Sequence, residues 1–179
     1  MRKIVIGIFA ITFILKTNSS FAWGKAGHQM VAQIAKAYLN KGVQDSVQKY
    51  LGKMTFEEAA TWMDDVRSDH SYDYMKSWHY INVEKDKTYV KTNTESVVFE
   101  LEKVIAELND KSKLTNEQKT LDIKILFHLV GDLHQPLHVG YGEDKGGNGI
   151  DVDFMGKSTN LHHVWDSDII ETKKQIVND

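Results

Sequence analysis

The chain has 179 residues, a formal net charge of −3 and no cysteine. This length predicts a single domain, and the lack of cysteine excludes a disulfide scaffold, a cysteine-ligated zinc or iron–sulfur site and a cysteine nucleophile. The charge alone gives no indication of nucleic-acid binding. The unusual feature is a set of eight histidines, all of which lie after residue 27.

Residues 1–22 have the pattern of a secretory signal peptide. Two basic residues near the start precede a run of twelve mainly apolar residues, Ile4 to Leu15, and Ser20-Phe21-Ala22 has the small-x-small form of a cleavage site. Twelve residues are too few to span a bilayer as a helix, although an uncleaved N-terminal anchor is the alternative. We expect cleavage after Ala22, a secreted or periplasmic protein without a membrane span, and a mature domain covering residues 23–179 with a net charge of −6.

Apolar residues at helical spacing predict several helices in the first part of the mature domain. Capping boxes precede two of them, because Thr55 is followed by Glu58 and Thr115 by Gln118. Pro136 ends or kinks the last of these helices. The predicted helices lie around residues 30–38, 43–51, 59–66, 97–108 and 121–133.

The chain changes character after Pro136. Residues 140–149 contain five glycines and predict an irregular loop, and alternating apolar residues over 150–155 predict a short strand or hairpin. Asn160 is placed to cap a last helix that reaches about Ile176. These elements predict an all-α domain with a small β-hairpin excursion.

Two histidine–aspartate pairs, each with a spacing of four residues, indicate metal binding. His128 and Asp132 share one face of a predicted helix, and His162 and Asp166 repeat the spacing on the last helix. A single pair of this kind is more often a solvated helix face or a satisfied core histidine. Two pairs in one short chain make that alternative less attractive.

Four further histidine and aspartate residues extend this set: His28, Asp64, His79 and His138. Zinc takes about four nitrogen or oxygen ligands. Five histidines and three aspartates are therefore too many for one zinc ion and suit two or three.

Cleavage after Ala22 would add another ligand. A free α-amine with a pKa near 8 loses its proton with little penalty at neutral pH, so Trp23 could bind a metal through its amine and its carbonyl oxygen. His28 follows five residues later and could complete this group. The alternative is a tryptophan packed at the edge of the domain.

In the order and the residues of these motifs, the chain resembles the S1/P1 nucleases, which are zinc-dependent enzymes that cleave single-stranded nucleic acids. It resembles zinc-dependent phospholipase C more distantly. The resemblance implies the helical fold shared by phospholipase C and P1 nuclease. The run from Gly131 to His138, Gly-Asp-Leu-His-Gln-Pro-Leu-His, is the most specific part. The matching segments are Trp23-Gly24 through Gly27-His28, Trp62-Met63-Asp64 with Arg67, Trp78-His79-Tyr80-Ile81-Asn82, Phe127 to His138, Gly146-Gly147-Asn148 and Asn160 to Asp166.

The resemblance implies three zinc ions with a ligand set carried over residue by residue. One zinc would be bound by Asp64, His79, His128 and Asp132. A second would be bound by His138, His162 and Asp166. A third would be bound by Trp23, His28 and Asp132, which would bridge two ions. The remaining histidines, His70, His134 and His163, are not ligands in this mapping; His134 would orient a neighbour or cap a helix end, and the other two would lie on the surface.

Two departures from the family pattern stand out. Some members have Asp at the position of Asn82, where it is thought to orient the attacking water, and Asn can position that water but cannot take its proton. The family also continues with a helical portion beyond the region that ends near Ile170, whereas this chain stops at Asp179. We expect that C-terminal portion to be missing here.

The resemblance places Asp64 and Asp132 at the reaction centre, where the metals they bind would activate water and stabilise the phosphate. Arg67, one turn after Asp64, could stabilise charge on the phosphate, or be an ordinary surface arginine. Tyr80 could stack on a base beside the scissile phosphate, or pack in the core.

The sequence therefore predicts a secreted, monomeric zinc endonuclease that hydrolyses single-stranded DNA and RNA to 5′-phosphorylated products, with possible 3′-nucleotidase activity. The first alternative is a phospholipase C-like zinc phosphodiesterase, in which the residue at Asp166 is typically Glu. The second is an inactive, truncated zinc-binding remnant.

Overall fold

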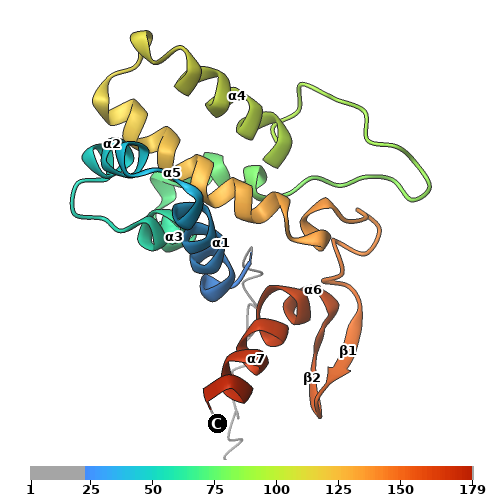
Figure 1. Cartoon of the computed structure of the whole chain (residues 1–179). Helices are drawn as coiled ribbons and strands as arrows, with labels where there is room; N and C mark the ends of the chain where they lie inside the picture. The colour runs from blue at the N-terminus through green and yellow to red at the C-terminus, as the bar shows by residue number, and fades with distance from the viewer. Residues whose placement is uncertain (1–22, 179) are drawn as a thin grey trace, which may run out of the picture.

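The computed structural model describes residues 23–178. The predicted signal peptide and its cleavage site, residues 1–22, lie outside the described residues. The elements are α-helices, 3-10 or π segments (η) and one pair of strands (Figure 1). In chain order they are α1 (Lys25–Tyr38), α2 (Lys41–Leu51), α3 (Phe56–Asp65), η1 (His70–His79), α4 (Val97–Asn109), η2 (Lys111–Lys113), α5 (Asn116–Leu133), η3 (Pro136–Val139), β1 (Asp151–Phe154), β2 (Lys157–Asn160), α6 (Leu161–His163), η4 (Val164–Asp168) and α7 (Ile169–Asn178).

Helix α5 is the central element of the fold. It contacts α1, α2 and α3 on one side and α4 and η1 on the other (Figure 1). One apolar cluster forms around Leu129 between α4, α5 and η1, and a second forms around Phe56 between α1, α2, α3 and α5. Both side chains are almost fully buried, so α5 and its polar residues are fixed from two sides.

The predicted helix starts are confirmed by their caps. Thr55 with Glu58 and Thr115 with Gln118 both form complete capping boxes, in which side chain and backbone satisfy each other's free groups. The side chain of Asn160 accepts a hydrogen bond from the backbone N–H of His163. Helix α5 ends at Leu133, before Pro136 begins η3.

The last predicted helix is not continuous. Asn160 begins α6, but the chain widens into a π turn over η4 before α7. At this turn the carbonyl of Asp166 accepts a hydrogen bond of 2.8 Å from the backbone N–H of Gly24. The N–H of Ile169 bonds instead to the carbonyl of Val164, five residues earlier. The N-terminal segment is thereby attached to the turn that carries Asp166.

Strands β1 and β2 form the predicted hairpin. They pair antiparallel, with Asp151 opposite Asn160 and Phe154 opposite Lys157. The two residues of the turn, Met155 and Gly156, both have positive φ, as two-residue hairpin turns of type I′ require. The all-α class with one small hairpin is confirmed.

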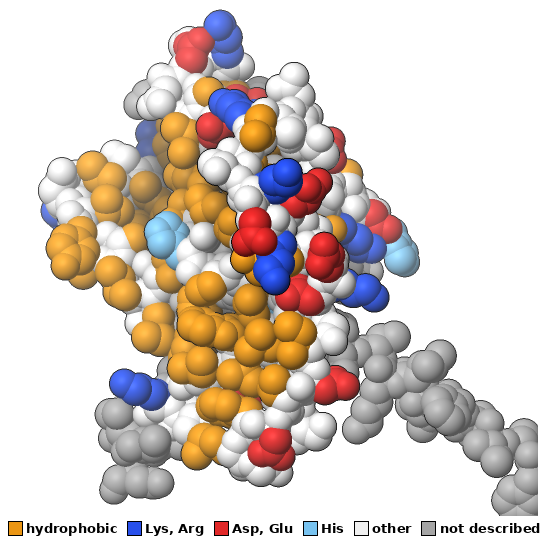
Figure 2. Space-filling view, turned by 90° about the vertical axis from the view of Figure 1, so that its right-hand side faces the viewer, with side chains coloured by type: hydrophobic (Ala, Val, Ile, Leu, Met, Phe, Trp, Pro, Cys, Tyr) orange, Lys and Arg blue, Asp and Glu red, His pale blue; other side chains and the backbone are white. Residues whose placement is uncertain are grey.

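Apolar side chains also reach the surface. Figure 2 shows them gathered over the lower part of one face, with acidic and basic side chains interspersed above. Among the helices of residues 23–178, none combines the length and the apolar character needed to cross a bilayer.

Candidate metal centre

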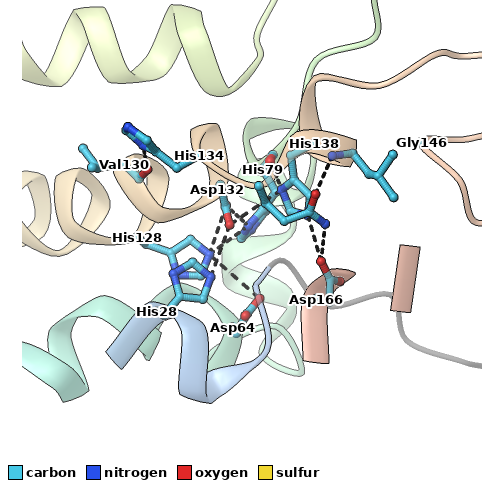
Figure 3. A network of polar contacts seen from close by, with 12 residues as sticks. His28, Asp64, His79, His128, Val130, Asp132, His134, His138, Gly146 and Asp166 are labelled. Atoms are coloured by element: carbon cyan, nitrogen blue, oxygen red, sulfur yellow. Dashed lines mark hydrogen bonds and ion pairs between the residues drawn. The ribbon is translucent and has the colours of Figure 1, made fainter. Parts of the chain in front are cut away.

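Asp132 lies at the centre of a cluster of histidines (Figure 3). Its side chain is fully buried, and its Oδ2 is 3.0 Å from His79 Nδ1 and 3.2 Å from His128 Nε2. Its Oδ1 is 3.2 Å from His28 Nε2. Helical spacing brings His128 beside Asp132, as the sequence predicts, whereas His28 and His79 come from α1 and η1.

Close packing of α1 against α5 places His28 in this cluster. A Cβ atom at Gly131 would lie 2.6 Å from His28 Nδ1, so only glycine leaves room for the ring. The ring of His28 stacks on that of His128 with 4.0 Å between their centroids. Asp64, from α3, completes this side of the cluster, with its Oδ1 4.0 Å from His128 Nε2.

A second group forms beside the first from His138, His162 and Asp166. His162 Nε2 is 3.1 Å from Asp166 Oδ2, and His138 Nε2 is 3.9 Å from Asp166 Oδ1. The two imidazole rings are stacked, with centroids 5.2 Å apart. The buried amide of Gln135 donates to Asp166 Oδ1, and its oxygen accepts from the backbone N–H of Leu137. Gln135 therefore fixes the orientation of Asp166.

Three of the rings are oriented by backbone carbonyls. The Nδ1 atoms of His128, His138 and His162 each lie 2.7 Å from a carbonyl oxygen, those of Ala60, His79 and Gly146 in that order. A ring that donates through Nδ1 keeps Nε2 unprotonated and able to bind a metal. In all three rings Nε2 points into the cluster.

The donor set fits divalent zinc. The cluster supplies imidazole nitrogen and carboxylate oxygen, the ligands that zinc takes. Within the described residues, Nδ1 of His28 is buried without a hydrogen-bond partner, and Nε2 of His28 faces Oδ1 of Asp132 at 3.2 Å. A cation in contact with such buried polar atoms offsets the cost of burying them. Three groups have ligand atoms within 4.8 Å of one another: His28, Asp64 and His128; His79, His128 and Asp132; and His138, His162 and Asp166.

Burial also sets the charge state of these groups. Burial, with His128 nearby, lowers the pKa of His28, and burial lowers the pKa of His138. Burial alone would raise the pKa of Asp132, but its contacts with His128, His28 and His79 hold that pKa well below its usual range. For His128, burial opposes the charged form, but Asp132 and Asp64 outweigh it and raise the pKa of this ring. Metal binding needs the carboxylate ionised and the imidazoles neutral, so a metal would compete with the proton at His128.

Trp23 lies next to this centre in the chain and in space. The hydrogen bond from Gly24 to Asp166 fixes the backbone just after Trp23. Its ring lies over Gly27, where a Cβ atom would come within 2.8 Å. The indole Nε1 is buried and has no hydrogen-bond partner within residues 23–178.

A cavity of about 350 Å³ opens beside the cluster. Tyr80 and Asn82 both line it, because the N–H groups of Ile81 and Val83 bond to the carbonyls of His138 and Gly140 and leave the alternate residues to face the cavity. The lining residues are Arg67, Lys76, His79, Tyr80, Asn82, Leu137, His138, Gly142, Lys145, Gly146, Asn148 and His162.

Arg67 lies in the cavity wall with Nη1 3.4 Å from Asp64 Oδ1. Tyr80 is 46% exposed, so its ring is a cavity surface and not a core residue. The three residues that the sequence singles out beyond the ligands, Arg67, Tyr80 and Asn82, thus share one cavity with three of the candidate ligands.

The other histidines lie apart from the cluster. His134 bonds through Nδ1 to the carbonyl of Val130 at the end of α5 (Figure 3), and His70 pairs with Asp73 on the surface. His163 is exposed, with Nε2 3.7 Å from Asp168. The sequence reasoning assigned no role to Gln135, although it lies between candidate ligands in the most specific motif.

A helical domain that gathers buried histidines and aspartates around one carboxylate, beside an open cavity, defines a candidate multinuclear metal protein. The S1/P1 Nuclease family matches residues 23–179. The chain therefore belongs to the S1/P1 nuclease family, which confirms the resemblance found in its motifs.

Characterised relatives agree with this assignment. Endonuclease 2 of Arabidopsis thaliana is 31% identical over 185 residues, covering 94% of this chain and 63% of the plant protein. Nuclease S1 of Aspergillus oryzae is 30% identical over 93% of this chain and 61% of its own length. Nuclease P1 of Penicillium citrinum is 30% identical over 81% of this chain and 57% of its own length. The chain thus spans about three fifths of the length of these relatives.

Proposed function

We propose that this chain is a zinc-dependent nuclease that hydrolyses phosphodiester bonds of single-stranded DNA and RNA to 5′-phosphorylated products, with 3′-nucleotidase activity as a further expectation. One observation carries the proposal: three groups of histidine and aspartate ligand atoms, one of which contains Asp132, lie beside a cavity that Arg67 also lines. The names of the relatives, nuclease and endonuclease, support the same reaction.

The proposed ligand set contains three zinc ions. Asp64, His79, His128 and Asp132 would bind one, His138, His162 and Asp166 a second, and Trp23 with His28 and the bridging Asp132 a third. The buried approach of His28 Nε2 to Asp132 Oδ1, at 3.2 Å, supports the third group.

The third group also requires a free amine at Trp23, and hence cleavage after Ala22, which accompanies export. The proposal further takes the exported protein to be a monomer. The start of the family match at residue 23 supports this boundary. Protein that retains residues before Trp23 should bind one zinc fewer, and an unchanged zinc content would contradict the role of the amine.

Zinc, when bound, lowers the pKa of a water nucleophile towards roughly 7 and neutralises phosphate charge. The side chains around the metal centre orient the phosphate and the attacking water. Arg67 donates to a non-bridging phosphate oxygen and stabilises the charge that develops there. The Asn82 amide holds the attacking water by hydrogen bonding without accepting its proton.

The exposed ring of Tyr80 supports a preference for single strands. An unpaired base can stack on an aromatic side chain, an interaction of about 1–3 kcal/mol that is insensitive to sequence. Bases in a duplex are already stacked and paired. The net charge of −6 of the mature chain also opposes tight binding to long duplexes, which depends on phosphate neutralisation.

Zinc content and nuclease turnover, measured together, test the proposal. The adjacent residues His162 and His163 provide a matched pair, because the first is buried in the cluster and the second is exposed. The wild type should contain three zinc ions and cleave a single-stranded oligonucleotide. His162→Ala should lose one zinc and more than 90% of the turnover, whereas His163→Ala should resemble the wild type. Bound zinc without turnover would favour an inactive zinc-binding remnant.

A further inference from the structure

The loop over residues 140–149 contains a lysine in an unfavourable backbone conformation. Lys145 has φ of +56°, and Gly146 and Gly147 follow with +61° and +80°. Glycine adopts such angles freely, but a residue with a Cβ atom does so only against a steric penalty. Strain of this kind concentrates where a side chain has to be placed for function, and Lys145 lines the cavity beside the metal cluster.

The loop is tied to the metal centre on both sides of this lysine. The carbonyl of Gly146 accepts the hydrogen bond from His162 Nδ1, at 2.7 Å. The N–H of Gly146 donates to the carbonyl of Tyr141 at 2.9 Å, and that of Gly147 donates to Asp144 Oδ1, also at 2.9 Å. The backbone of Lys145 therefore has a fixed position relative to the candidate ligand His162.

Three cationic side chains line the cavity, and they differ in their partners. Arg67 lies 3.4 Å from Asp64, and Lys76 lies 2.6 Å from Asp73. No ion pair or hydrogen bond is found for the ammonium group of Lys145 within the part of the chain that the structure describes. Its charge is accordingly available to an anion that enters the cavity.

We propose that Lys145 binds a phosphate of the substrate strand next to the scissile phosphate. The inference rests on the proposed nuclease function and deepens it, because it makes an oligonucleotide, with at least two phosphates, the preferred substrate over a dinucleotide. The cluster and Arg67 engage the phosphate that is cut. Lys145, on the 140–149 loop that lines the same cavity, contacts the neighbouring phosphate and is a substrate-binding residue without a part in the chemistry.

The substitution Lys145→Gly separates this role from a structural one. It removes the cation and also relieves the positive φ, so the fold should not be weakened. Two control substitutions each reproduce one of these two effects. Met155→Gly relieves the same kind of strain, at φ of +53° on the exposed hairpin turn, without loss of charge. Lys157→Ala removes one exposed positive charge outside the cavity lining.

The measurements are kcat and KM of zinc-loaded protein on ten-residue oligothymidylate and on the dinucleotide TpT, together with the melting temperature. For Lys145→Gly we expect KM for the oligonucleotide to rise by up to about fivefold, the size of one solvent-exposed ion pair. The kcat, the KM for TpT and the melting temperature should not worsen. The salt dependence of oligonucleotide binding should become shallower by about 0.7 in log–log slope, the value of one phosphate on a single strand.

Both controls should behave as the wild type does. An unchanged KM and salt slope in Lys145→Gly, or an equal rise of KM for TpT, would overturn the inference while leaving the nuclease function intact. A wild type that cleaves neither substrate would instead contradict the proposed function. In that case fluorescence anisotropy of labelled oligothymidylate still decides the role of Lys145, since equal affinity of variant and wild type would refute it.

Discussion

Asp122 is a buried carboxylate outside the candidate metal centre. It lies on the face of α5 that packs against α4, is 6% exposed, and its Oδ2 has no hydrogen-bond partner among the described residues. Burial and the nearby Glu107 raise its pKa to about 6, against a smaller opposing effect of Lys103. Lys103 is itself paired with Glu100, at 3.1 Å. The folded chain therefore holds a carboxylate that resists ionisation up to about pH 6 and is ionised at neutral pH only at a cost in stability.

This shift predicts that Asp122→Asn stabilises the protein at neutral pH. With a pKa near 6 in the folded state and near 3.8 in the unfolded state, the folded state binds more protons between about pH 4 and pH 6. Stability falls as pH rises through that window, and the penalty is complete above it. Asn removes the penalty, so we expect a gain of about 1–2 kcal/mol at pH 7.5 that disappears near pH 4.

Urea denaturation of metal-free protein at both pH values measures this difference without interference from zinc loss. The exposed Asp110, which pairs with Lys113 at 2.7 Å, provides the control. Asp110→Asn should bring no gain at pH 7.5. A gain in Asp122→Asn of equal size at pH 4 and pH 7.5 would show that ionisation is not the cause.

Among single residues, the sequence predicts contacts between residues that are close together in the chain. The pairs His128–Asp132 and His162–Asp166 follow from helical spacing alone, and both come within 3.2 Å. The role of Gln135 could not be read in this way, because its partner Asp166 lies 31 residues further along the chain. That contact depends on how α6 and η4 pack beside η3.

At the scale of elements, α5 shows how a local signal positions the site. It carries His128 and Asp132 and begins at a complete capping box, in which Thr115 Oγ1 accepts from the N–H of Gln118 at 3.2 Å. The backbone N–H of Thr115 donates to Gln118 Oε1 at 2.8 Å. The box lies at the far end of the helix from the metal cluster, so its contribution to stability can be tested apart from the site.

Thr115→Ala should destabilise the protein by about 1 kcal/mol, because it removes the side-chain acceptor for one free N–H group. For a chain of this size we expect the melting temperature to fall by roughly 2–4 °C. Thr115→Ser keeps the hydroxyl and should lose much less. Zinc content should be unchanged in both variants. An equal loss in the Ser variant would mean that the threonine methyl group, and not the cap, is responsible.

The elements that the sequence does not predict are those set by tertiary contacts. No helix is predicted over residues 70–79, although Tyr72, Met75 and Trp78 recur every three residues, as in a 3-10 helix. These residues form η1, in which Met75 and Trp78 pack into the core beside α4 and α5. The π turn η4 likewise has a distant partner, since the carbonyl of Asp166 accepts a hydrogen bond from Gly24, more than 140 residues earlier. Capping and periodicity within a segment contain no information about either contact.

At the scale of the whole molecule, the candidate metal centre joins segments that are distant in the chain. Its residues come from α1, α3, η1, α5, η3, α6 and η4, and no cysteine is present to form a covalent link between them. The two apolar clusters pack around α5. The cluster of histidines instead brings together the N-terminal segment and the chain after Pro136, as the hydrogen bond from Gly24 to Asp166 shows. Metal binding would accordingly contribute to the stability of the entire domain.

Removal of zinc should therefore lower the melting temperature of the whole chain. A ligand that binds only the folded state stabilises it by about 4 kcal/mol per site when its free concentration exceeds the dissociation constant a thousandfold. Three such ions correspond to a decrease of more than about 20 °C at roughly 2–4 °C per kcal/mol. Calorimetry before and after chelation, with zinc content measured on the same samples, provides the test, and added zinc should restore the original melting temperature.

The variant His162→Ala should have a lower melting temperature at the start and a smaller decrease on chelation, because one of its ions is already absent. An unchanged melting temperature in protein shown to be free of metal would mean that the apolar clusters and hydrogen bonds alone hold the buried histidines together, and that the ions have no structural role.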